Sequence, residues 1–354
     1  MTDGSDIPRN VVIVDDSRTI RALLRATIDA DPRFTVVGEA GDPYEAREVI
    51  KRTNPDIITL DVEMPRMNGL VFLEHLMRLR PMPVVMVSSR TREHSVDAVR
   101  ALALGAIDCV DRARLQSDPL QRTRFLDALY SASNATIAPR PATQAGARAP
   151  APLGGFRWNG RIVLIGSSTG GVDALERVFC HFPENAPPTI VAQHMPGPFL
   201  ASFAARLNVR MRPKVCLATD ESRMEQGQIL IAPGGEHHAT LAGLAPGRVA
   251  LLQGDGTDLY VPSVDVLFRS AKPLAERVLA VMLTGMGRDG AEAMADLRTL
   301  GARTLAQSGE TSVVDGMPRA ARNAGAVERN VPLDRLGAEI LAMCSKSPVG
   351  ERNA

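Results

Sequence analysis

Short apolar runs alternate with amphipathic stretches along most of this 354-residue chain. In the first half, the apolar runs predict five strands, at Val11–Val14, Phe34–Gly38, Asp56–Leu60, Pro83–Val87 and Ala106–Val110. Helical patterns lie between these runs and after the last one. Because short strands that alternate with helices are typical of βαβ units, the pattern predicts a parallel, doubly wound sheet.

A second alternation begins at Arg161 and predicts seven strands, at 161–165, 188–193, 214–218, 228–232, 248–252, 278–283 and 303–306. The two halves are separated by "PRPATQAGARAPAPLGG", which is rich in Pro, Ala and Gly and typical of a flexible linker. The chain is therefore predicted to hold two α/β domains. A five-stranded parallel domain spans 1–130, a linker spans 131–158, and a doubly wound, mostly parallel domain spans 159–347.

Composition excludes several classes of function. The formal net charge is +1, so no overall field attracts nucleic acid or an anionic membrane. No apolar run approaches the roughly 20 residues that span a bilayer, and the first ten residues lack the pattern of a signal peptide. The four cysteines form no C-x-x-C motif. We expect a cytoplasmic protein that binds no nucleic acid and is not membrane-embedded.

Carboxylates follow two of the predicted strands in the first half. Asp15 and Asp16 end the run "VVIVDDS", and Asp61 ends "IITLD". Residues at the carboxyl ends of parallel strands meet at one edge of the sheet, where ligands bind. Three carboxylates there repel one another unless a cation joins them, and oxygen ligands of high charge favour Mg²⁺. The alternative is that the Asp pair is only a strand end followed by a helix cap.

Two further residues follow the fourth and fifth strands, the hydroxyl of Ser88 and the basic Arg112. With these residues in order, the segment 9–130 resembles the receiver domain of two-component response regulators. The resemblance implies a flavodoxin-like fold and a phosphoryl group that Asp61 accepts from a histidine kinase.

The same resemblance implies that Asp15, Asp16 and Asp61 hold Mg²⁺ together with the backbone of Glu63. It also implies that Ser88 is the switch hydroxyl. One departure concerns the pair Arg112-Ala113, which stands where that family usually has Lys-Pro. Because guanidinium and ammonium groups differ in size and hydration, the departure affects the coupling of phosphorylation to shape change.

In the second half, "GSSTGG" at 166–171 lies between an apolar run and a helical pattern. Such a turn either cradles a phosphate on backbone amides or presents Ser168 as a nucleophile. The glycine spacing fits neither G-x-G-x-x-G nor a P-loop. A nucleophile requires a base and an orienting acid, and His194 and Asp289 each follow another predicted strand. The pattern therefore indicates a Ser-His-Asp triad.

Alternatives exist for two of these residues. His237 and His238 also lie near a strand end, and one of them is a rival base or a substrate-positioning residue. A metal site formed by this pair with Glu236 lacks a third ligand at a clear spacing. Asp289 is alternatively a helix N-cap. The order Ser, His, Asp differs from that of α/β-hydrolases, so the turn does not indicate that fold.

The segments "IGSSTGG", "AQHMP", "IAPGG" and "LTGMGRDGA" resemble the signatures of the chemotaxis protein-glutamate methylesterase (CheB) family. The resemblance implies that Ser168 is the nucleophile, His194 the general base and Asp289 its orienting acid. Ser167 replaces the alanine usual in the family. The implied substrates are glutamyl methyl esters and glutamines on the cytoplasmic helices of chemoreceptors, and the implied kinase is of the chemotaxis type. No cofactor is expected in this domain.

From their positions, the backbone N–H groups of Thr169 and Met286 are candidate oxyanion donors. Two other functions were weighed. A DNA-binding response regulator requires a basic recognition helix, which neither the charge nor a helix-turn-helix pattern supports. A nucleotide-binding module is disfavoured by the glycine spacing. The sequence thus predicts a phosphorylation-regulated methylesterase and glutaminase.

Overall fold

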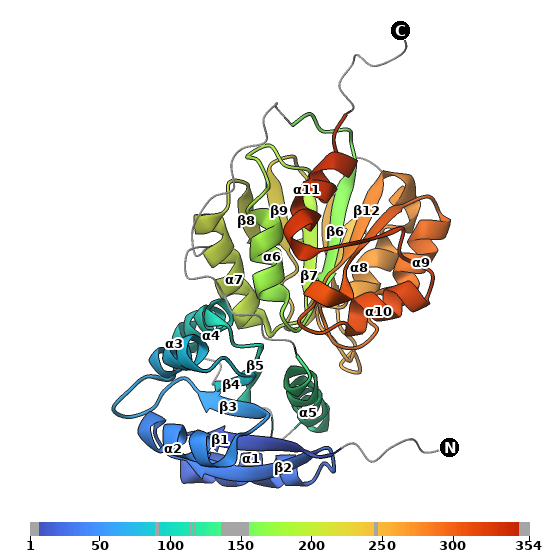
Figure 1. Ribbon diagram of the computed structural model, residues 1–354. Coiled ribbons are helices and arrows are strands. Elements are labelled where there is room, and N and C mark those ends of the chain that lie inside the picture. The colour runs from blue at the N-terminus through green and yellow to red at the C-terminus, as the bar shows by residue number, and fades with distance from the viewer. Residues whose placement is uncertain are drawn as a thin grey trace, which may run out of the picture. The chain divides into compact units, whose positions relative to one another are not determined.

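The computed structural model describes residues 7–88, 92–112, 115, 118–135, 156–243 and 247–346 (Figure 1). The chain divides into two compact units, residues 1–140 and 141–354. Each unit contains its own parallel sheet. Within the described ranges, no helix combines the length and the apolar character needed to cross a membrane.

The first unit is a five-stranded parallel sheet in the order β2-β1-β3-β4-β5. Its strands are β1 (Arg9–Val14), β2 (Phe34–Ala40), β3 (Ile57–Asp61), β4 (Val84–Ser88) and β5 (Asp108–Asp111). Its helices are α1 (Arg18–Asp29), α2 (Pro43–Thr53), α3 (Gly69–Leu79), α4 (Arg92–Leu104) and α5 (Pro119–Ser133). This is the flavodoxin-like order, which confirms the predicted fold. Because β1 and β3 are neighbours, the residues that follow them meet at one edge.

Local sequence explains these elements. The central strands are continuous apolar runs, as parallel strands covered on both faces must be. All of β3 and β4 is buried. Helix starts are fixed by polar side chains, since Ser17, Asp42 and Asn68 each accept a hydrogen bond from a backbone N–H in the first turn of α1, α2 and α3.

The second unit is a seven-stranded parallel sheet in the order β14-β13-β12-β6-β7-β9-β8. The strands of this sheet are β6 (Ile162–Ser167), β7 (Thr189–Gln193), β8 (Lys214–Leu217), β9 (Gln228–Ile231), β12 (Val278–Met282), β13 (Arg303–Gln307) and β14 (Arg329–Val331). The α-helices are α6 (Gly171–Phe179), α7 (Gly197–Arg210), α8 (Val264–Ser270), α9 (Ala291–Thr299), α10 (Gly316–Asn323) and α11 (Leu333–Met343). The central strand β6 has β7 and β12 as its neighbours.

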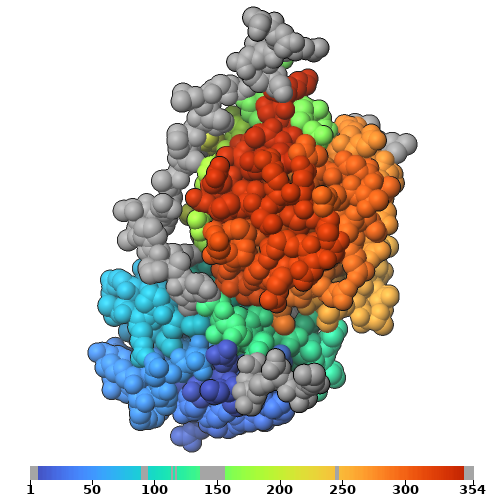
Figure 2. Space-filling view, turned by 45° about the vertical axis from the view of Figure 1, so that its right-hand side comes forward, coloured from blue at the N-terminus to red at the C-terminus, as the bar shows by residue number. Residues whose placement is uncertain are grey.

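Helices cover both faces of this sheet. On one face, α8, α9 and α10 form a core with alternate strand residues such as Leu164 and Ala280. Val163 and Ile165 of β6 point to the opposite face and are equally buried, beneath the layer that includes α6 and α11. In the space-filling view, the orange-to-red segments that include α9, α10 and α11 form a continuous outer surface (Figure 2). The predicted doubly wound α/β arrangement is confirmed.

Two parts of the second unit differ from the predicted alternation. The run at 248–252 forms a strand, β11 (Arg248–Gln253), but this strand lies outside the main sheet. It pairs antiparallel with β10 (His237–Ala242), which the sequence did not predict. The apolar pattern missed β10 because this strand begins with two histidines, and it missed β14 because only one of its three residues is buried.

The ends of the predicted linker lie next to regular structure. Helix α5 continues to Ser133, beyond the predicted domain limit at 130. Trp158 forms an isolated antiparallel bridge with Ser345, near the other end of the second unit. The interior of the predicted linker, residues 136–155, lies outside the described residues, as does residue 347.

Candidate functional site

A tight turn between β6 and α6 carries Ser168. Gly170 has a φ of +78°, in the left-handed region, and a Cβ added there would lie 2.7 Å from Cβ of Val313. The N–H of Gly171 donates to the carbonyl of Ser168 at 2.8 Å, and the N–H of Ser168 donates to the carbonyl of Thr284 at 3.1 Å. These N–H groups are used within the fold, which disfavours a phosphate cradle. Ser168 itself is 9% exposed.

His194 directly follows β7, the parallel neighbour of β6. Ser167 and Gln193 are register partners, so Ser168 and His194 are the next residues on adjacent strands. The Nε2–H of His194 donates to Oδ2 of Asp289 at 2.8 Å. Its buried Nδ1 has no hydrogen-bond partner among the described residues. Because the proton of this neutral imidazole is on Nε2, Nδ1 is the basic nitrogen.

Asp289 lies in the loop between β12 and α9, and its carboxylate is fixed from several directions. Besides the imidazole, it accepts hydrogen bonds from the backbone N–H groups of Val264 at 2.7 Å and Asp265 at 2.9 Å. The hydroxyl of Ser263 donates to it at 3.0 Å. Burial acts to raise the pKa of Asp289, but the hydrogen bond from His194 and the backbone donors outweigh burial, so the pKa is lowered. The acid therefore stays ionised beside the imidazole.

A buried amide joins the nucleophile and the base. The hydroxyl of Ser167 donates to Oε1 of Gln193 at 2.6 Å. Nε2 of Gln193 donates to the carbonyl of Ser168 at 2.9 Å and to that of His194 at 3.1 Å. A Cβ at Gly171 would lie 2.0 Å from Oε1 of Gln193, so this position requires glycine. Sequence reasoning missed Gln193, whose only signal was its place at a strand end.

The two predicted oxyanion donors flank the nucleophile. Thr169 follows Ser168 in the turn and is 4% exposed. Met286 follows Gly285, and a Cβ at Gly285 would lie 2.7 Å from Cβ of Ser168. Both backbone segments therefore border the serine.

His238, one of the two histidines of the rival pair His237-His238, is fully engaged in hydrogen bonds. His238 is 1% exposed, and both of its ring nitrogens are engaged. Nδ1 accepts the N–H of Ser263 at 3.0 Å, and Nε2 lies 3.2 Å from Oδ2 of Asp258. With no nitrogen left to take a proton from a serine, His238 is not the general base.

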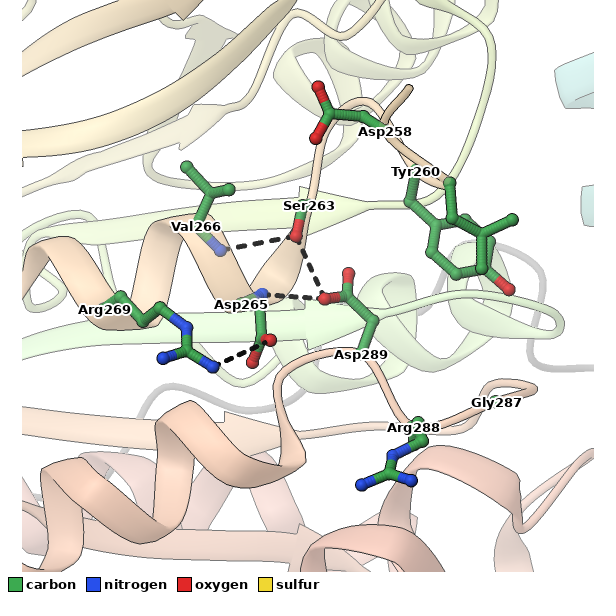
Figure 3. A pocket seen from close by; sticks show the side chains of 10 residues that line it. Asp258, Tyr260, Ser263, Asp265, Val266, Arg269, Gly287, Arg288 and Asp289 are labelled. Atoms are coloured by element: carbon green, nitrogen blue, oxygen red, sulfur yellow. Dashed lines mark hydrogen bonds and ion pairs between the residues drawn. The ribbon is translucent and has the colours of Figure 1, made fainter. Parts of the chain in front are cut away.

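Tyr260 is a second residue that the sequence did not single out. Its ring stacks on the imidazole of His194, with centroids 4.0 Å apart and planes 4° apart. Tyr260 also lines a cavity of about 440 Å³ on the side of Asp289, which Figure 3 shows from close by. Arg269 and Arg288 line the same cavity and form ion pairs with acidic residues of their own helical turns. The cavity borders the acid of the triad and the tyrosine that covers the base.

In the first unit, the structure brings Asp15, Asp16 and Asp61 together. One carboxylate oxygen of each lies within 4.8 Å of the others, the only such group of potential metal ligands in the described ranges. Oδ2 of Asp15 is buried and accepts no hydrogen bond from a described residue. An orphaned oxygen among three carboxylates fits a hard cation such as Mg²⁺. Glu63 follows Asp61 by two residues and is exposed.

The cluster is electrostatically strained. Burial, and then the negative charge of Asp15, raises the pKa of Asp61 to about 6. Burial also raises the pKa of Asp15. Nη1 of Arg112 lies 3.3 Å from Oδ2 of Asp61 and 3.8 Å from Oδ2 of Asp15. Ser88 is buried at the end of the neighbouring strand β4, whereas Ala113 lies outside the described residues.

Comparisons with known proteins identify both domains. The CheB methylesterase family matches residues 163–340, and the response regulator receiver domain matches residues 11–120. The chain is 48% identical over 346 residues to a protein-glutamate methylesterase/protein-glutamine glutaminase of Rhizobium etli, covering 97% of this chain and 99% of that protein. A protein of Caulobacter vibrioides with the same description is 48% identical over 342 residues, covering 95% of this chain and 98% of that protein.

Among solved structures, the catalytic domain of the Thermotoga maritima CheB methylesterase is similar to the second unit. The two share 32% sequence identity with a TM-score of 0.50. The match covers 52% of this chain and 99% of that one. Family, relatives and site geometry agree, and this chain belongs to the CheB methylesterase family, with a response regulator receiver domain preceding the catalytic domain.

Proposed function

We propose that this protein hydrolyses glutamyl methyl esters on the cytoplasmic helices of chemoreceptors, releasing methanol, and deamidates glutamines there, releasing ammonia. Ser168 is the nucleophile, His194 the general base and Asp289 the acid that orients the base. The observation that carries this assignment is the hydrogen bond from Nε2 of His194 to Asp289, which leaves a basic Nδ1 on the strand end beside Ser168.

The geometry supports the following sequence. Nδ1 of His194 takes the hydroxyl proton of Ser168 as the serine oxygen attacks the ester carbonyl. The charge that develops on the carbonyl oxygen is stabilised by the backbone N–H groups of Thr169 and Met286. His194 then returns the proton to the departing methoxide, and methanol leaves an acyl-enzyme. Water, deprotonated by the same nitrogen, attacks the acyl group and restores Ser168. Asp289 remains ionised and stabilises the imidazolium at each stage.

The receiver domain supplies the control. Asp61 accepts a phosphoryl group from a chemotaxis-type histidine kinase. Asp15, Asp16 and Asp61, with the backbone carbonyl of Glu63, would hold Mg²⁺, and the bound ion would neutralise phosphoryl charge. Ser88 donates its hydroxyl to a phosphoryl oxygen, and the guanidinium of Arg112, already beside Asp61, provides the cation.

These roles are divided between two domains that a linker joins. We place the receiver at residues 1–130, the linker at 131–158 and the catalytic domain at 159–347. Because its substrates lie on the cytoplasmic part of receptors, the protein works in the cytoplasm, without nucleic acid and without insertion into the membrane.

Methanol release from methylated receptor tests this function, with and without acetyl phosphate as the phosphodonor. The wild type should release methanol, faster with the phosphodonor. Ser168→Ala should reduce kcat by about 10⁴- to 10⁶-fold, because the triad acts as a unit. Its thermal unfolding should match that of the wild type. Methanol release by Ser168→Ala at the wild-type rate would show that another residue attacks the ester.

A further inference from the structure

His238 is a buried histidine that the proposed catalytic steps do not use. The N–H of Ser263 donates to its Nδ1, so this nitrogen carries no proton. The proton is therefore on Nε2, which donates to Oδ2 of Asp258. The neutral ring is thus saturated, with one bond to each end of the segment 258–263. A residue that holds both ends of a segment fixes the position of what lies between them.

That segment carries two groups that touch the triad. Tyr260, in its middle, stacks its ring on the imidazole of His194 at 4.0 Å. Ser263, at its end, donates its hydroxyl to Asp289 at 3.0 Å, and the backbone N–H groups of the next two residues donate to the same carboxylate. Figure 3 shows the hydroxyl of Ser263 and the backbone nitrogen of Asp265 directed at Asp289, with Tyr260 on the other side of that carboxylate. The base and its acid both depend on the placement of this segment.

Pro262 is buried, but packing gives the first half of the segment, residues 258–260, little support. The cavity of about 440 Å³ lies against it, lined by Asp258, Leu259, Tyr260 and Ser263. Leu259 is 47% exposed, and the preceding residues 255–257 are exposed as well. A segment bordered by a cavity and by solvent owes its placement to hydrogen bonds. Those from a ring that is 1% exposed, sheltered from competing water, are the strongest candidates.

We propose that His238 is a positioning residue of the esterase, acting through Tyr260 on the ring plane of His194. This role rests on the proposed function of the Ser168 site. The flat stack confines the imidazole to rotation within its own plane and shields one face of it from water. An aromatic face also attracts the imidazolium that forms when Nδ1 takes the serine proton. His238 thereby favours the transition state without touching the substrate.

The kinetic test measures kcat and KM for methanol release from methylated receptor by full-length variants. Tyr260→Leu removes the stacked ring and should lower kcat by about 10- to 100-fold, the range expected when a catalytic group loses its alignment. His238→Leu should lower kcat by about 10-fold or more with KM changed by less than about 3-fold. A larger change in KM than in kcat, for either variant, would contradict a role in positioning the base.

Three variants separate positioning from general support of the fold. Tyr260→Phe retains the ring and should recover most of the loss caused by Tyr260→Leu. His238→Asn retains an acceptor near Ser263, and should recover more activity than His238→Leu. Thr240→Val is the matched control on the same strand, since it removes the hydrogen bond from Oγ1 to Ala250 and touches nothing in 258–263. A loss in Thr240→Val equal to that in His238→Leu would reduce His238 to a structural residue.

A double-mutant cycle tests whether the histidine acts through the tyrosine. His238→Leu should lower kcat about 10-fold in the wild type but less than about 3-fold when Tyr260 is already leucine. Effects that multiply in the double variant would overturn the proposed route.

An NMR measurement needs no substrate, so its outcome is independent of the reaction. A parallel ring at this distance displaces the ring-proton signals of His194 upfield. Tyr260→Leu should abolish that displacement and His238→Leu should diminish it. If His238→Leu leaves the His194 signals unchanged, the proposal fails even when the esterase is active. If the wild type releases no methanol while the displacement is present, the proposed function fails instead.

Discussion

Asp289 and Asp61 hold equivalent places in the two domains, yet their surroundings are opposite. Each follows or ends a buried strand near the centre of a parallel sheet. Asp289 accepts hydrogen bonds from an imidazole, a hydroxyl and two backbone N–H groups, and its pKa is lowered. Asp61 accepts one bond from the N–H of Val62 and one from Arg112 within the described residues, and burial raises its pKa to about 6.

The difference matches the role that we propose for each carboxylate. An acid that orients a base must be ionised and immobile before the substrate arrives, so the protein supplies all of its donors in advance. A phosphoacceptor must receive a cation and a phosphoryl group. Its carboxylate is therefore left beside other carboxylates, and their excess negative charge is one that a bound cation would offset. One site is complete within the chain, and the other is completed by what binds.

The largest expected effect tests the complete site. Asp289→Asn keeps the shape but presents an amide that no longer favours the Nε2–H tautomer of His194, so Nδ1 loses its basic lone pair. We expect kcat for methanol release to fall by about 10⁴-fold, as in other triads that lose this charge. Asp296→Asn, an exposed surface acid of the same domain paired with Lys272, is the matched control and should retain the wild-type rate. The N-cap of α9 is Gly290, so Asp289 is not the cap of the helix that follows it. A loss below 10-fold would show that Asp289 only satisfies the first-turn N–H groups of α8.

The second prediction tests the incomplete site through its pKa. Because the folded-state pKa of Asp61 is raised to about 6, ionised Asp61 destabilises the folded receiver at pH 7.5. Asp61→Asn removes that charge and should stabilise the receiver by about 1–3 kcal/mol, at ~1.4 kcal/mol per pKa unit. The gain should shrink as the pH falls through 6. It should vanish below about pH 4, where Asp61 is protonated in both the folded and the unfolded state.

Calorimetry of the full-length variant and wild type in EDTA, at pH 7.5 and pH 4, measures this gain. Asp289→Asn should change the free energy of unfolding with the opposite sign, so that the variant is less stable than the wild type at pH 7.5. The lowered pKa of Asp289 means that its ionised form stabilises the fold above about pH 4, and this contribution is lost as the pH falls further. A gain for Asp61→Asn that is the same at both pH values would reflect packing rather than charge.

The sequence predicted the residues at the strand ends of both sites, but not the contacts that support them. Several site residues come at the end of an apolar run in the sequence, namely Asp15, Asp16, Asp61, Ser168 and His194. Because parallel strands bring such ends together, the apolar pattern was sufficient to predict that these residues lie near one another. The parallel sheets were predictable for the same reason, since their strands are continuous apolar runs. The side-chain contacts that hold the Ser168 site in place were not predictable from the sequence. Gln193 joins two strand ends through its amide, and nothing in its neighbourhood along the chain indicates that contact.

The sequence offered His238 only as one of a pair and did not single out Tyr260, for a related reason. Both belong to the hairpin region and its following loop, which pair antiparallel outside the main alternation. The hydrogen bonds of His238 to Asp258 and Ser263, and the stack of Tyr260 on His194, exist only after β10 and β11 pair and the loop returns to the triad. The sequence could show a pair of histidines near a strand end, but tertiary structure decides which is buried and which nitrogen carries its proton.

The smallest expected effect concerns Arg112, the one cation beside Asp61 among the described residues. Its Nη1 lies nearer to Asp61 than to Asp15, at 3.3 Å and 3.8 Å, so the guanidinium partly offsets the crowding that raises both pKa values. Arg112→Lys keeps the charge on a more compact head. We expect it to accept phosphate at Asp61 but to change the ratio of activated to basal esterase rate by about 2- to 5-fold, less than a charge-assisted hydrogen bond is worth.

Arg112→Ala sharpens this prediction, because it removes the charge altogether. Phosphate should still load onto Asp61, since Asp15 and Asp16 remain to hold the cation, but the activated-to-basal ratio should fall below that of the lysine variant. Phosphorylation and methanol release, measured together on wild type, Arg112→Lys and Arg112→Ala, distinguish loading from switching. If activation in Arg112→Ala equals that of the wild type, the guanidinium only offsets the charge of the carboxylates before phosphorylation. Another group then couples the phosphoryl charge to activation.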